Sequence, residues 1–196
     1  MSQDARALRS ALREQRRTAP ASERIAAAER IAGHLLSMPF MPRHGHVAGY
    51  WAVDGEIGLH AWQLRLPPTL TYCLPVLHGD CLRFAPWRPG AALVPNRYGI
   101  PEPDVTPDAL LAGEDMALVV APLVAFDAHC HRLGMGAGWY DRSFAFRRDR
   151  AAPPWLVGAA FASQQVAAIA VESWDVPMDA ICTERETFLA PSDTTE

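Results

Sequence analysis

Glycines at 134, 136 and 138 alternate with larger residues, and this spacing points to a loop that binds an anion. The loop follows an apolar run over 116–126 that predicts a buried strand, and it precedes a segment of helical character from Trp139 to about Arg148. Without side chains, glycines let the backbone come close to a ligand. Backbone N–H groups that lead into a helix N-terminus form an anion site, so we expect a phosphate group here.

The side chains after the glycines extend this chemistry. Tyr140 offers a hydroxyl group or a stacking surface, Asp141 a carboxylate for a metal ion, and Arg142 a cation for a further phosphate oxygen. The loop is not the dinucleotide fingerprint, because Trp139 occupies the position of its last glycine. It is not a Walker A loop either, because no Gly-Lys-Ser/Thr occurs in the chain.

All 18 basic residues of the chain are arginine. The absence of lysine excludes a P-loop lysine, a Schiff-base lysine and attachment of pyridoxal phosphate. A phosphate must therefore be held by arginine, backbone amides, a helix dipole or a metal ion. Arginine suits this task, because its planar fork binds oxygens bidentately and stays charged.

Length and composition place the chain among folded proteins. Its 196 residues, 49% hydrophobic and 20% charged, predict a single domain over 1–190 with a disordered tail at 191–196. The net charge of −4 gives no general attraction to nucleic acid or to an anionic membrane. No apolar run is long enough to span a bilayer, and the basic N-terminus does not read as a secretory signal, so we expect a cytoplasmic protein.

Helical and extended patterns alternate along the sequence. Helices are expected at 4–17, 22–37 with Ser22 as N-cap, 59–65, 139–148 and 164–170, and strands at 46–53, 70–77, 82–87, 116–126, 156–161 and 180–183. This order predicts an α/β fold, a layered helix/sheet/helix single domain with a mainly parallel sheet. Ligands bind at the carboxyl ends of such strands, where both the glycine loop and residues 53–56 fall.

The pattern Phe126-Asp127 followed by Arg132-Leu133-Gly134 and the next eight residues resembles the signature of the 5-formyltetrahydrofolate cyclo-ligase (methenyltetrahydrofolate synthetase) family. Further segments look like family landmarks in the family's order. They are the basic N-terminal helix, Trp51 with 55–57, 74–75, 99–103, 164–165 and 174–177. The resemblance covers nearly the whole chain.

The resemblance implies an ATP- and magnesium-dependent ligase. In this family the formyl oxygen of 5-formyltetrahydrofolate attacks the γ-phosphate of ATP, which gives a phosphorylated formyl (imino-phosphate) intermediate. N10 then closes the ring, and the products are 5,10-methenyltetrahydrofolate, ADP and phosphate. The implied partners are these small-molecule substrates, with no nucleic acid and no membrane, and we expect a monomer.

The same resemblance implies roles for individual residues. Those implied to bind ATP are Arg6, Arg9, Arg132, Leu133, Gly134, Met135, Gly136, Ala137, Gly138, Trp139 and Tyr140. Those implied to bind the folate are Trp51, Glu56, Met135, Gly136, Ala137, Gly138 and Trp139. Arg132 and Tyr140 are implied to be catalytic, and Asp141 and Asp175 to be ligands of Mg²⁺.

The chain departs from the family pattern at three positions. Ala5 stands where family members often carry a lysine for ATP, and the neighbouring Arg6 is the candidate replacement. Met135 and Ala137 are uncharged where some members carry a basic residue. Arg132, Arg142 or the first helix must then neutralise more of the phosphate charge.

Alternative interpretations remain open for the residues and for the chain. Each site candidate also has a purely structural interpretation: Glu56 as an exposed turn carboxylate, Asp175 as a cap, Trp51 as a core residue, and Asp141 as an acid favoured at a helix N-terminus. The chain itself is compatible with a folate- or nucleotide-binding homologue without turnover. A related sugar-phosphate isomerase or CoA-transferase-like enzyme is a third possibility, which the two metal-ligand candidates disfavour.

Overall fold

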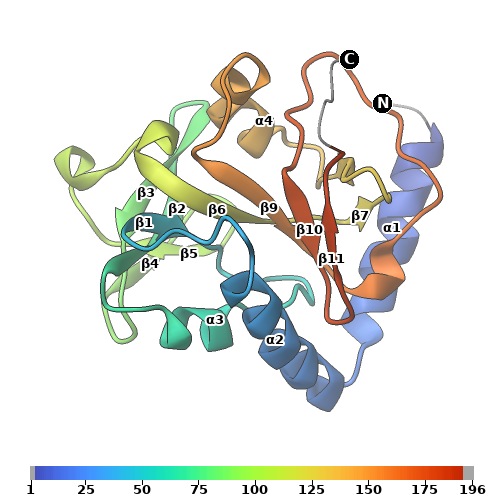
Figure 1. The fold of residues 1–196 in the computed structure, drawn as a ribbon, viewed down its shortest axis with the longest axis horizontal. Coiled ribbons are helices and arrows are strands. Elements are labelled where there is room, and N and C mark those ends of the chain that lie inside the picture. The colour runs from blue at the N-terminus through green and yellow to red at the C-terminus, as the bar shows by residue number, and fades with distance from the viewer. Residues whose placement is uncertain (1–2, 192–196) are drawn as a thin grey trace.

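A computed structural model describes residues 3–191 (Figure 1). The helices are α1 (Gln3–Thr18), α2 (Ala21–Leu36), α3 (His60–Arg65) and α4 (Trp139–Ser143), and 3-10 turns span Pro107–Ala109, Gly113–Asp115, Ala145–Arg148 and Ala162–Gln164. The strands are β1 (Gly45–Ala48), β2 (Leu70–His78), β3 (Cys81–Pro86), β4 (Leu93–Pro95), β5 (Pro101–Pro103), β6 (Met116–Pro122), β7 (Ala125–Phe126), β8 (Arg132–Leu133), β9 (Trp155–Ala159), β10 (Ala180–Cys182) and β11 (Thr187–Leu189).

Seven strands form the main sheet in the order β11-β10-β9-β6-β1-β2-β3. The pairs β10/β9, β9/β6, β6/β1 and β1/β2 are parallel, and only the outer pairs β10/β11 and β2/β3 are antiparallel. The sequence prediction of an α/β fold with a mainly parallel sheet is confirmed. Because the five parallel strands point the same way, the loops after β1, β6, β9 and β10 meet at one edge of the sheet.

The sheet is buried on both faces. Along β6, Leu118 and Val120 belong to one apolar cluster and Val119 and Ala121 to the other, as expected for alternating side chains in a central strand. The first cluster lies under α2 and α3, which supply apolar side chains such as Ile31. The second lies under α4 and the neighbouring turn and loops, so helices flank both faces (Figure 1).

The expected helix over 164–170 is wrong, because the chain there makes only the 3-10 turn Ala162–Gln164. The backbone of the following residues is used in tertiary hydrogen bonds. The Val166 N–H donates to the Phe126 carbonyl, and the Ile169 N–H donates to Asp127 Oδ2. These N–H groups are therefore not available for the i→i−4 bonds of a helix.

Two predicted strands are shorter than expected. The strand over 46–53 ends at Ala48, and the run over 116–126 divides after Pro122, where the short β7 pairs with β8. The glycine loop therefore follows the β7–β8 hairpin rather than the long central strand.

Two predicted helices also differ from the structure. The helix expected at 139–148 divides into the five residues of α4 and a 3-10 turn. Helix α2 begins at Ala21 rather than after a Ser22 cap.

Within the part of the chain that the structure describes, no helix is long and apolar enough to cross a membrane. The tail expected at 191–196 lies, apart from Pro191, outside the described residues.

Candidate active site

Most of the predicted site residues come from three segments near the carboxyl edge of the sheet. These are α1, the loop after β1, and the run from β8 through the glycine loop into α4, whereas Asp175 comes from the loop before β10. Helix α1 carries no apolar face of the main core, and it is instead fixed to the other two segments by its arginines.

The glycine loop is shaped by backbone conformations that favour glycine. Gly136 has φ +96° and Gly138, the residue before α4, has φ +67°. A Cβ atom at Gly134 would meet no atom within 4 Å, so this part of the loop is open. Because α4 has only five residues, its dipole contributes little to an anion site. The backbone N–H groups and nearby arginines are the groups that remain to bind a phosphate.

Arg9 of α1 joins the glycine loop and retains a free donor group. Its Nε donates to the Gly134 carbonyl at 2.8 Å. Its Nη1 is buried and has no hydrogen-bond partner among the described residues. Buried polar groups in folded proteins are almost always hydrogen-bonded. An oxygen of a bound anion would supply the missing acceptor, so this geometry fits a phosphate.

Arg16, one of the residues that the sequence analysis did not select, anchors the loop after β1. Its side chain is 1% exposed, and its Nη2 lies 3.0 Å from Asp54 Oδ2 and 3.4 Å from Glu56 Oε1. Its Nε and Nη1 donate to the carbonyls of Asp54 and Leu123. Arg16 thus joins the folate-binding candidate Glu56 to the loop that leads to β7.

Asp54 also forms ion pairs with two further arginines of α1. Arg13 donates to Asp54 Oδ2 at 2.7 Å, and Arg17 donates to Asp54 Oδ1. Burial alone would raise the pKa of the Asp54 carboxyl, but the hydrogen bonds from Arg13 and Arg17 outweigh it and lower that pKa to about 2. The arginines of α1 recur at intervals of three and four residues from Arg9, which places them along one side of the helix. That spacing is the sequence pattern that predicts their shared role.

Glu56 is buried, not an exposed turn carboxylate. Its side chain is 8% exposed, and its Oε2 accepts a hydrogen bond from the Val53 N–H at 3.1 Å. Burial raises the pKa of the Glu56 carboxyl, against the opposing effects of the Val53 N–H and the Arg16 charge. Burial and then the Glu56 charge raise the pKa values of the Tyr50 and Tyr140 hydroxyls. The catalytic candidate Tyr140 therefore lies within electrostatic range of Glu56.

Arg132 and Asp141 form an ion pair at the two ends of the glycine loop. Asp141 Oδ1 also accepts a hydrogen bond from the Val176 N–H at 3.2 Å, and Arg132 Nη1 donates to the Val176 carbonyl. Asp175, the residue before Val176, accepts from the Glu172 N–H through its Oδ2 at 2.9 Å. The two metal-ligand candidates thus come from segments joined at Val176. No group of three or more His, Cys, Asp and Glu that could hold a metal occurs among the described residues.

Two candidates make no hydrogen bond, ion pair or ring contact with the glycine loop among the described residues. Arg6 is exposed on α1, and no hydrogen bond or ion pair involves its side chain among residues 3–191. Trp51 is 37% exposed, and its ring meets Trp87 edge to face at a centroid distance of 5.8 Å. Trp51 is therefore a surface aromatic backed by a second ring and not a core residue.

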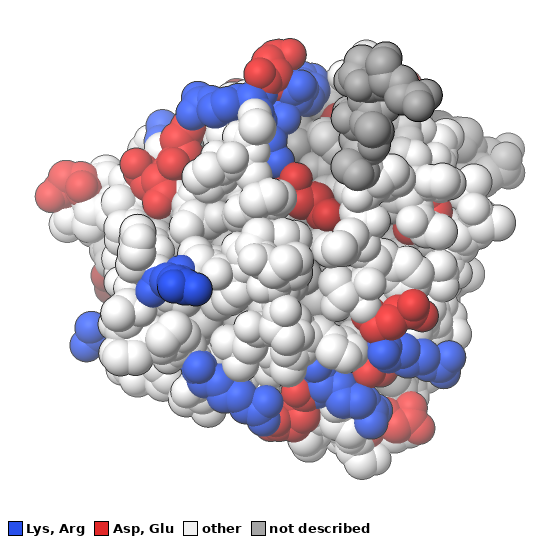
Figure 2. All heavy atoms as spheres, in the orientation of Figure 1, with Lys and Arg blue, Asp and Glu red and all other residues white. Residues whose placement is uncertain are grey.

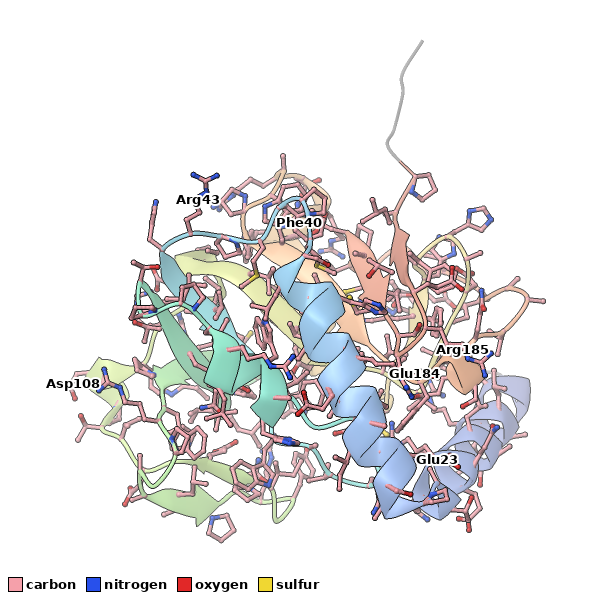
Figure 3. The ribbon with its side chains drawn as sticks, turned by 60° about the horizontal axis from the view of Figure 1, so that its bottom comes forward. Glu23, Phe40, Arg43, Asp108, Glu184 and Arg185 are labelled. Carbon is pink, nitrogen blue, oxygen red and sulfur yellow. The ribbon has the colours of Figure 1, made fainter. Side chains whose placement is uncertain are left out.

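A hollow with a volume of about 520 Å³ opens between α1, α2 and the loops after β9 and β10. Arg16 is part of its lining, but none of the residues proposed to bind ATP, folate or metal is. Figure 3 shows Glu184 and Arg185 of its lining near Glu23 of α2. On the face shown in Figure 2, charged residues of both signs lie mainly around the rim and the centre is uncharged, so this face offers no continuous basic surface.

Comparison with known proteins connects this arrangement to a described family. The model of the 5-formyltetrahydrofolate cyclo-ligase family matches residues 1–184. The 5-formyltetrahydrofolate cyclo-ligase of Haemophilus influenzae is 32% identical over 175 residues, which cover 87% of this chain and 92% of the relative. The protein of the same name from Escherichia coli K12 is 32% identical over 177 residues, covering 88% and 96%.

A solved structure shares the fold. Aquifex aeolicus 5,10-methenyltetrahydrofolate synthetase superposes with a TM-score of 0.80 at 25% sequence identity. The superposition covers 98% of this chain and 95% of that chain. The similarity therefore extends over α1, the sheet and the glycine loop together.

Proposed function

This chain belongs to the 5-formyltetrahydrofolate cyclo-ligase family and is an enzyme of that kind, and we propose that it cyclises 5-formyltetrahydrofolate to 5,10-methenyltetrahydrofolate with consumption of MgATP. The proposed route passes through a phosphorylated formyl group, the imino-phosphate intermediate. The products are the methenyl folate, ADP and phosphate. We also expect a monomeric, cytoplasmic enzyme that binds neither nucleic acid nor membranes.

The observation that carries the ATP part of this proposal is the junction of Arg9 with the glycine loop. One nitrogen of the guanidinium holds the Gly134 carbonyl, and another is buried without a partner. Charge-assisted hydrogen bonds from arginine to phosphate are strong and geometrically specific. The remaining residues of the loop, 133 and 135–140, would bring their backbone around the same phosphates, with Arg132 beside them.

The chemical task of the protein is to position two substrates and to neutralise charge. Glu56 and Trp51 would hold the folate, with Glu56 kept in place by Arg16 and the Val53 N–H. Arg132 would stabilise the charge of the transferred phosphoryl group. The Tyr140 hydroxyl, which stays protonated because its pKa is raised, would donate a hydrogen bond at the reacting formyl group.

The carboxylate oxygens of Asp141 and Asp175 are the type of ligand that a magnesium ion prefers. Mg²⁺ prefers oxygen ligands and often takes only one or two protein carboxylates, the rest being water and phosphate oxygens. Asp141 Oδ2 has no protein partner among the described residues, while its Oδ1 is engaged by Arg132 and Val176. When bound, the ion would neutralise charge on the phosphates.

The test is to mix the purified protein with 5-formyltetrahydrofolate and MgATP and to follow the near-ultraviolet absorbance of the methenyl product. We expect a rise that requires folate, ATP and magnesium together. A flat trace from a folded protein that binds ATP would contradict the proposal and favour a binding protein without turnover, to which Ala5 in place of the family's lysine would contribute. Restoring that cation by Ala5→Lys would then be the next measurement.

A further inference from the structure

Two guanidinium groups gather on one indole ring beside the glycine loop. Arg97 Cζ lies 5.1 Å and Arg142 Cζ 4.9 Å from the ring centroid of Trp139. Neither arginine forms an ion pair with a carboxylate among the described residues. Two like charges at one ring repel each other, and a bound anion would remove this cost.

The two arginines differ in how they are held. Arg142 is fixed, because its Nε donates to the Asp80 carbonyl at 2.7 Å and its Nη1 to the Ala137 carbonyl at 2.8 Å. Arg97 is exposed in the turn between β4 and β5, and its guanidinium makes only ring contacts, to Trp139 and to Tyr98. All its N–H groups are therefore available to a ligand.

A hollow of about 360 Å³ adjoins Arg97. Its lining residues are Leu77, Gly79, Asn96, Arg97 and Glu102. The Glu102 side chain is fixed there, since its Oε1 accepts hydrogen bonds from the Leu77 N–H at 2.9 Å and from Asn96 Nδ2 at 2.8 Å. Arg97 is the one cation among these lining residues, so an anionic group that enters the hollow would bind at Arg97 and not beside Glu102.

The position of Arg97 favours contact with the folate rather than with ATP. The phosphates are proposed to bind Arg9 and the backbone of the glycine loop, whereas Arg97 contacts the side-chain ring of Trp139, five residues after Gly134. The segment that carries Arg97 continues from Trp87, the ring that backs the folate candidate Trp51. We propose that Arg97, with Arg142, binds the carboxylates of the glutamate tail of the folate substrate. This inference rests on the proposed function.

The test compares a ligand that has the tail with one that lacks it. Tryptophan fluorescence would measure the affinities of 5-formyltetrahydrofolate and of 5-formyltetrahydropteroate, which has no glutamate. We expect Arg97→Ala to weaken binding of the folate about tenfold and to leave binding of the pteroate and the KM for ATP unchanged, because a lost charge-assisted contact has that magnitude. Arg97→Lys should recover part of the loss.

The matched control is Arg43→Ala, which removes the same charge from an exposed side chain (Figure 3). Arg43 lies directly before β1, at the end of that strand opposite to its carboxyl end. Equal losses for both ligands, or a changed KM for ATP with unchanged folate binding, would overturn the inference and leave the proposed function intact. A wild-type protein that binds neither folate nor pteroate would instead contradict the proposed function itself.

Discussion

The buried Nη1 of Arg9 is the clearest single group for ATP binding. We expect Arg9→Ala to raise the KM for ATP by about tenfold to a hundredfold, since a hydrogen bond from a charged donor contributes about 1.5–3 kcal/mol. The KM for the folate should change little. Steady-state rates at varied ATP concentrations measure this, with Arg24→Ala on α2 as a control that removes a cation whose side chain makes no hydrogen bond or ion pair among the described residues. An unchanged KM for ATP would place the phosphates elsewhere.

Asp141 tests the metal assignment. We expect Asp141→Asn to lower kcat by about tenfold or more, because it removes a carboxylate from Mg²⁺ and from Arg132, and to change the dissociation constant of the folate little. The measurement is the rate as a function of magnesium concentration. Asp104→Asn, at an exposed position, is the control. A variant that kept the full magnesium-dependent rate would show that Asp141 is not a ligand.

At the residue scale, the functional residues that could be predicted from the sequence are those whose pattern lies within a short stretch of the chain. Gly134, Gly136 and Gly138 lie within five residues, so their spacing alone indicates a loop that approaches a ligand. The spacing of the α1 arginines places Arg16 on a charged side of the helix, but the partners of Arg16 and Arg97 could not be predicted in this way. Glu56 and Trp139 lie 40 and 42 positions away from them and are brought close only by the fold.

At the scale of elements, the ion pairs between α1 and the loop after β1 predict a dependence of stability on pH. The pKa of Asp54 lies at about 2 in the folded protein, below its ordinary 3.8. The unfolded chain therefore binds more protons in this range, and the stabilisation is complete above about pH 4 and lost as the pH falls towards 2. A shift of this size corresponds to about 2 kcal/mol.

Asp54→Asn removes this contribution. We expect the variant to lose up to about 2 kcal/mol of unfolding free energy at pH 7 and to show a shallower loss of stability below pH 4 than the wild type. Urea unfolding at a series of pH values measures both effects. Asp104→Asn should follow the wild-type curve, and an Asp54→Asn curve that coincides with it would mean that these ion pairs contribute nothing to folding.

The elements that the sequence predicted well are those stabilised by their own apolar pattern. Helix α2 buries Ala28, Ile31 and Leu35 at helical spacing, and its extent was predicted within a residue or two. The helix expected at 164–170 does not form because N–H groups of this segment donate to Phe126 of β7 and to Asp127 directly after it. This is a tertiary effect that periodicity in the sequence does not reveal. At the C-terminal end of α4, the side chain of Ser143 donates to the Trp139 carbonyl and accepts from the Leu82 N–H of β3, a tertiary contact that periodicity does not reveal either.

For the whole molecule, ligand binding should stabilise the fold because both proposed substrates join segments that are distant in sequence. A ligand at one hundred times its dissociation constant adds about 2.7 kcal/mol, which for a chain of this size is a rise in Tm of about 5–10 °C. We expect MgATP and 5-formyltetrahydrofolate each to produce such a shift in a thermal unfolding experiment.

The Arg9→Ala variant separates the two ligands in this measurement. A tenfold weaker affinity for ATP should reduce the shift at the same ATP concentration by about 3–5 °C, because it removes about 1.4 kcal/mol of binding free energy. The shift produced by the folate should stay at its wild-type value, since Glu56 is held by Arg16 and not by Arg9. If both shifts fell together, Arg9 would instead support the whole carboxyl edge of the sheet, and α1 would act as one structural unit for both substrates.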